Sequence, residues 1–128
     1  MNLPKSFYDY ELESSMCSCV AGLHERITLY EWVNPEWVRY VSIDCFDKDK
    51  FDVNLILPQG YVKENKDKVK EDMVTYSWEV RDCCEEKDCD ALVATASVET
   101  LEQVETEVKY MFEYQRNVGL AYLEMSKK

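Results

Sequence analysis

The chain has 128 residues, of which 46% are hydrophobic, and its formal net charge is −11 at pH 7. A chain of this length and composition is expected to fold as one domain, residues 1–128, and is not intrinsically disordered. It contains no run of about 18 apolar residues, so we expect no transmembrane helix.

The first expected element is a short N-terminal helix. Ser6 is a suitable helix cap, and several apolar side chains follow it as far as Met16. The apolar run 17–23 fits a helix end and a strand equally well, and Gly22 indicates a break there.

Three segments then alternate between apolar and polar residues, which is the pattern of half-buried strands. They are residues 26–33, 37–46 and 51–57. An Asn-Pro dipeptide after the first of them favours a type I turn, and a polar loop separates the second from the third. We therefore expect an antiparallel meander of three strands.

The second half of the chain is expected to hold one uncertain segment and two further strands. Residues 61–72 are densely charged and fit either a short surface helix or a long loop. Alternation over residues 73–81 predicts a fourth strand, and residues 91–97 predict a fifth.

Residues 99–126 carry the strongest periodic signal and are predicted to form one long helix. Thr100 and Gln103 have the spacing of a capping box at its start. Gly119 weakens the helix by roughly 1 kcal/mol relative to alanine, and marks a close backbone approach or a fraying end. The apolar belt of this helix is wider than one sheet covers. The N-terminal segment, a second copy of the chain or a bound protein is needed to cover its flank.

The expected fold class is α+β, an antiparallel sheet of about five strands with a short N-terminal helix and a long C-terminal helix packed on one face. The element order is α-β-β-β-(α)-β-β-α. This order, in a small acidic chain, is similar to the layout of type III secretion chaperones and their structural relatives. The resemblance lies in element order and charge, and it implies a dimeric adaptor that holds a segment of a partner protein.

The negative charge is concentrated in residues 82–107, where nine acids and one base give a net charge of −8. Nucleic-acid phosphates are repelled by such a surface, whereas a basic protein surface is attracted and associates faster. A run of charge is also typical of a solvated face that keeps a protein in solution. We expect a basic protein partner, with no direct binding to nucleic acid or membrane.

The predicted partner-binding surface combines these carboxylates with aromatic anchors. Its residues are Asp82, Glu85, Glu86, Asp88, Asp90, Glu99, Glu102, Glu105, Trp32, Tyr30, Tyr110 and Tyr114. The leading hypothesis is a small acidic protein-binding module. It would act as an inhibitor, or as an immunity-type or viral anti-defence antagonist, on a basic surface of a nucleic-acid-handling protein.

Chemistry at a catalytic or metal site is not indicated. The six cysteines lack the paired spacing of structural zinc sites, and acidic neighbours raise thiol pKa values. His24 is the only histidine, and the three glycines form no phosphate-binding loop. We therefore expect no catalytic residue, no metal ligand and no cofactor; a Cys-based zinc or redox protein is a second alternative. Because the N-terminus has no basic region followed by an apolar one, we expect a cytoplasmic protein with reduced thiols.

Overall fold

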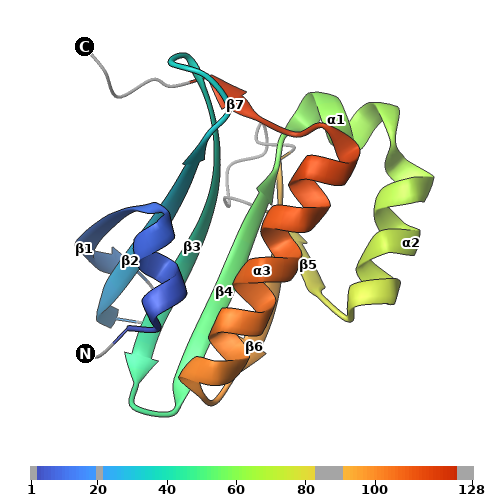
Figure 1. Cartoon of the computed structure of the whole chain (residues 1–128). Coiled ribbons are helices and arrows are strands. Elements are labelled where there is room, and N and C mark those ends of the chain that lie inside the picture. The colour runs from blue at the N-terminus through green and yellow to red at the C-terminus, as the bar shows by residue number, and fades with distance from the viewer. Residues whose placement is uncertain (1–2, 20–21, 83–90, 124–128) are drawn as a thin grey trace. The chain divides into compact units, whose positions relative to one another are not determined.

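The structure is a computed structural model that describes residues 3–19, 22–82 and 91–123. It is α+β, with a mostly antiparallel sheet of seven strands and a long helix near the C-terminus (Figure 1). Two compact units are present, Met1–Val53 with Ser97–Lys128, and Asn54–Ala96. The single domain expected from the length stays a prediction. Within the described residues, the helices lack the length and hydrophobicity that a membrane-spanning helix needs.

The first unit contains most of the strands. Its elements are the 3-10 helix η1 (Lys5–Asp9), β1 (Glu11–Cys19), β2 (Gly22–Trp32), β3 (Trp37–Asp47), the start of β4 (Lys50–Leu57), the end of β6 (Leu92–Val98), α3 (Leu101–Val118) and β7 (Tyr122–Leu123). The strand order is β1-β2-β3-β4, and β7 pairs with β3. The helix α3 packs against β3, where the Gln115 side-chain amide donates to the carbonyl oxygen of Tyr40 at 3.1 Å.

The second unit contains the rest of β4 and β6 together with α1 (Gln59–Glu64), α2 (Lys66–Tyr76) and β5 (Glu79–Asp82). In this unit β6 lies between β4 and β5. The uncertain segment 61–72 is therefore helical. The predicted strand over 73–81 is wrong in its first part, because α2 continues to Tyr76. Val69 and Met73 are one helical turn apart and both are buried, so their packing outweighs the strand-like alternation.

The predicted N-terminal helix is wrong beyond Asp9, because residues from Glu11 onward form β1. This strand pairs with β2 in an antiparallel hairpin that runs from Glu11 opposite Tyr30 to Cys19 opposite Gly22. Cross-strand pairing satisfies the backbone of a segment whose serines and cysteines are modest helix formers. The expected sheet of about five strands consequently becomes one of seven, with β1 and β7 added.

The three-strand meander is confirmed as β2, β3 and β4. Ile27 lies opposite Ile43 and Leu29 opposite Val41, and all four side chains are buried. At the turn, the Asn34 side-chain oxygen accepts hydrogen bonds from two backbone N–H groups. Alternation along the strands thus predicted correctly which faces are apolar.

The capping box at the start of α3 is confirmed, because Thr100 accepts from the backbone N–H of Gln103 and the Gln103 side chain accepts in return. The predicted end of the helix is wrong. Gly119 adopts a left-handed φ of 73°, and the N–H groups of Gly119 and Leu120 bond back to the carbonyls of Arg116 and Gln115. This is the pattern of a Schellman motif, which ends a helix and releases the chain toward β7.

The flank of α3 that needed a cover is occupied by the N-terminal segment of the same unit. Phe7 is buried, and the Tyr10 ring stacks on the Phe112 ring with their centroids 4.4 Å apart. The N-terminal segment therefore covers this flank of α3. Its Ser6 contacts Glu105, which is 99 positions later in the chain.

Candidate functional site

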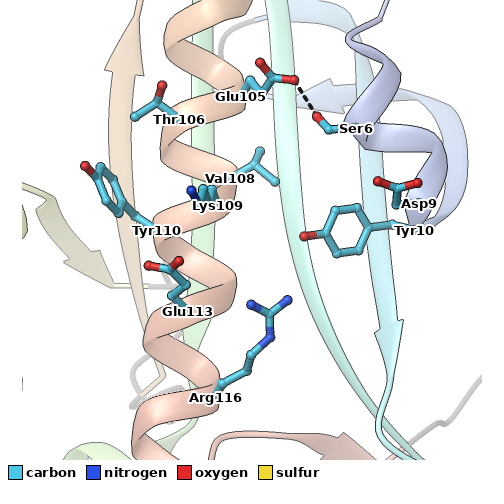
Figure 2. Close-up of a pocket in the computed structure, with 10 residues that line it drawn as sticks. All are labelled: Ser6, Asp9, Tyr10, Glu105, Thr106, Val108, Lys109, Tyr110, Glu113 and Arg116. Atoms are coloured by element: carbon cyan, nitrogen blue, oxygen red, sulfur yellow. Dashed lines mark hydrogen bonds between the residues drawn. The ribbon is translucent and has the colours of Figure 1, made fainter.

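A groove lies between η1 and α3 in the first unit, with a volume of about 560 Å³ (Figure 2). It is lined by Ser6, Asp9, Tyr10, Glu105, Thr106, Val108, Lys109, Tyr110, Glu113 and Arg116. Most of these residues come from α3, and three come from the N-terminal segment. The groove is thus made by two parts of the chain that meet only in the folded protein.

The α3 side of the groove follows from helical spacing. Glu105, Lys109 and Glu113 are each four residues apart, so they lie along one side of the helix. Val108 is buried beneath them, whereas Tyr110 is 43% exposed and lies on the other side of α3 from Tyr10 (Figure 2). The helix therefore presents alternating charges above an apolar residue.

The N-terminal side of the groove is held by two contacts to α3. The Ser6 hydroxyl donates to a Glu105 carboxylate oxygen at 2.5 Å (Figure 2). Tyr10 stacks on Phe112, with an angle of 9° between the ring planes. Phe7 anchors η1 in the core, and its N–H donates to the carbonyl of Pro4. These contacts bring the Asp9 carboxylate to the edge of the groove.

Arg116 lines the groove and forms an ion pair with Glu31 on β2. Its Nε donates to Glu31 Oε1 at 3.0 Å, and its Nη2 donates to the other carboxylate oxygen. Arg39 Nη1 also donates to Glu31 Oε1, at 3.0 Å. The hydrogen bond from Arg116 is the main cause that lowers the pKa of Glu31, and the same contact raises the pKa of Arg116. The contact with Glu31 thus fixes the position of the Arg116 side chain at the groove.

The remaining charges of the groove are mainly negative. Asp9, Glu105 and Glu113 contribute three carboxylates, and none of them forms a salt bridge within the part of the chain that the structure describes. Lys109 is exposed and supplies one positive charge. The groove therefore favours a positively charged ligand over an anion.

The predicted carboxylates are only partly gathered at this groove. Glu105 lines it, whereas Glu99 and Glu102 are exposed near the start of the same helix. Asp82 is exposed at the end of β5, in the second unit. The other four, Glu85, Glu86, Asp88 and Asp90, lie outside the described residues.

The predicted aromatic anchors occupy three different environments. Tyr110 is exposed and lines the groove. Tyr30 and Trp32 are half-buried on β2, where their polar groups donate to the carboxylates of Glu13 and Glu11. Tyr114 is only 2% exposed and belongs to the core, because it lies on the inward side of α3.

Sequence reasoning did not select most of the residues that line the groove. The helical spacing from Glu105 is a signal that would have identified Lys109 and Glu113. No local signal places Ser6, Asp9 and Tyr10 beside them, because that contact is made by distant parts of the chain.

His24 forms a separate buried cluster in the first unit. Its Nε2 lies 3.0 Å from a carboxylate oxygen of Asp44, its Nδ1 lies 3.1 Å from the carbonyl of Gly22, and Arg26 donates to the same Asp44 oxygen at 2.8 Å. Both His24 and Asp44 are less than a tenth exposed. Because His24 and Asp44 are buried, we interpret this cluster as a structural one.

The described residues hold no group of three or more His, Cys, Asp and Glu side chains arranged to bind a metal ion. Comparisons of the chain with protein-family models, curated proteins and solved structures give no match. Any functional assignment consequently depends on the geometry and charge of the groove and its surroundings.

Proposed function

We propose that this protein is a small acidic protein-binding module that acts by binding rather than by catalysis. Its partner is a nucleic-acid-handling protein with a basic surface, which the module occupies as an inhibitor or as an immunity-type or anti-defence antagonist in the cytoplasm. The supporting observation is the groove between η1 and α3, where the carboxylates of Asp9, Glu105 and Glu113 line a concave surface.

The charge around the groove supports this proposal. Residues 99–107 contain four glutamates and no base, and Glu99 and Glu102 are exposed. Together with the net charge of −11, these carboxylates attract a basic surface from a distance and raise the association rate.

Tyr110 is the aromatic residue that we expect to contact the partner. It is exposed on α3 within the same groove, and tyrosine is among the side chains that most often contribute large binding energies at interfaces. In this proposal Tyr110 supplies apolar contact, whereas the surrounding glutamates mainly set the rate and salt dependence of association.

The test is affinity capture from a lysate of the organism that carries the gene, with this chain as bait. We expect a basic nucleic-acid-handling protein to be retained at about 50 mM salt and largely released at about 500 mM, because screening weakens exposed charge pairs. The double variant Glu99→Gln and Glu102→Gln should slow association with the purified partner by about threefold or more.

The matched control is the double variant Glu64→Gln and Glu71→Gln. It changes the net charge by the same amount but alters exposed glutamates on the helices of the second unit. If both double variants slow association equally, or if capture is insensitive to salt, the proposal is wrong. Salt-insensitive capture by a stable dimer would instead support the chaperone-like adaptor.

A further inference from the structure

The groove is large enough to receive a group from a partner. Its volume of about 560 Å³ falls within the range of roughly 300–1,000 Å³ that is typical of binding pockets in proteins. Its lining includes the apolar groups of Val108, Tyr10 and Tyr110, and the polar groups of hydroxyl, carboxylate and cationic side chains. A long side chain with an apolar stem and a charged head matches both kinds of surface.

The charge of the groove determines whether a positive or a negative head group is favoured. Glu105 and Glu113 are eight residues apart on α3, which separates them by about 12 Å along the helix axis, and Asp9 lines the same groove from the N-terminal segment. The lining holds three carboxylates and two cations, Lys109 and Arg116, and Arg116 is held at Glu31, a carboxylate that it shares with Arg39. A cationic head is therefore favoured and an anionic one is repelled.

A second copy of the chain is a poor occupant for the same reason. Each copy carries a net charge of −11, and both acidic surfaces would repel each other. The Tyr10 ring adds attraction for a cation that lies over the face that does not stack on Phe112.

We infer that the groove between η1 and α3 binds one lysine or arginine side chain that projects from the basic partner. This inference rests on the proposed function and specifies where the partner is held. The stem of the side chain packs on Val108 and Tyr10, and its head lies near the carboxylates of the rim.

The test uses a defined probe, the peptide acetyl-Gly-Arg-Gly-amide, titrated into the isotopically labelled full chain and followed by NMR. We expect saturable shifts of backbone amides in residues 6–10 and 105–113, which carry the groove. The same peptide with citrulline in place of arginine keeps the shape without the charge and should produce little shift.

Three variants distinguish the groove from the general acidic surface. Glu105→Gln with Glu113→Gln should raise the Kd of the arginine peptide at least about threefold, whereas Glu99→Gln with Glu102→Gln should leave it nearly unchanged. The two double variants lie on or beside the same helix and remove the same charge. Lys109→Gln should lower the Kd about twofold, a gain that a folding defect would not produce.

Peptide shifts outside the groove, equal effects of the two double variants, or equal binding of the citrulline peptide would overturn this inference. In each of these cases the proposed function would still be decided by the salt-dependent capture of the partner. Conversely, saturable binding of the peptide in the groove without capture of a basic partner would support the site and refute the proposed function.

Discussion

Glu31 connects the sheet to the end of the groove, and its replacement by glutamine is a direct test of the structure. The Glu31 carboxylate accepts hydrogen bonds from Arg116 on α3 and from Arg39 on β3. Arg39 also donates to the carbonyl of Leu120, just after α3 ends. Glu31→Gln keeps the shape of the side chain and one acceptor oxygen, but it removes the charge that both arginines share.

The expected cost follows from the exposure of these groups. An exposed ion pair contributes about 0.2–1 kcal/mol, and a two-point contact with arginine lies at the upper end of that range. The Glu31 side chain is 24% exposed and serves two arginines, so we expect Glu31→Gln to lower the free energy of unfolding by about 1–2 kcal/mol. In a chain of this size that corresponds to a fall in Tm of roughly 3–8 °C.

The assay is urea unfolding followed by circular dichroism at neutral pH and over a series of acidic pH values. The contact with Arg116 holds the pKa of Glu31 below its usual value. The stability that its charge contributes is therefore complete above the usual pKa of a glutamate and is lost as the pH falls through the folded-state pKa. The difference between wild type and Glu31→Gln should shrink accordingly in acid.

Glu36→Gln is the matched control, because Glu36 is exposed in the turn between β2 and β3 and forms no ion pair among the described residues. It should change the free energy of unfolding by less than about 0.5 kcal/mol. A Glu31→Gln variant as stable as wild type, or one whose deficit is the same at neutral and acidic pH, would refute the proposed role of the Glu31 charge.

Three further predictions concern other parts of the first unit. Gly119→Ala should lower the free energy of unfolding by about 1 kcal/mol in a thermal or urea assay, because a residue with a Cβ is strained at a left-handed φ of 73°. The strain comes from the backbone alone, since no atom lies within 4 Å of the added Cβ, and Gly119→Asn should therefore lower the free energy of unfolding by less. Burial raises the pKa of the Cys45 thiol to about 11, so Cys45 should resist alkylation by iodoacetamide near pH 8 in the native protein and react after unfolding, as read by peptide mass spectrometry. Asp44→Asn should lower the free energy of unfolding by about 1–3 kcal/mol, because the buried Asp44 carboxylate oxygen is a hydrogen-bond partner of both His24 and Arg26; an unchanged free energy of unfolding would contradict the role of this cluster.

Local patterns predicted the fold well where one face of an element is buried along its whole length. The alternation of Ile27, Leu29, Val41 and Ile43 corresponds to buried faces of β2 and β3. The start of α3 could also be predicted from the sequence, because the capping box is made by residues three positions apart. The same local reading failed at residues 11–16, where pairing with β2 decides the conformation.

Local sequence patterns predicted less of the candidate site. Sequence reasoning identified Glu105 and Tyr110 through charge and aromatic content, but it could not tell that Tyr114 faces the core. A broad apolar belt on a helix leaves the boundary between its buried and exposed sides undetermined until its neighbours are known.

The sequence alone therefore determined the α+β class, the meander, the start of the last helix and the excess of negative charge, since each depends on composition or on residues close along the chain. The tertiary structure decided the β1–β2 hairpin, the helical α2 and the groove. The groove exists because Ser6 and Tyr10 reach Glu105 and Phe112, about a hundred positions away, and such contacts are set by which surfaces bury each other on folding rather than by any local pattern.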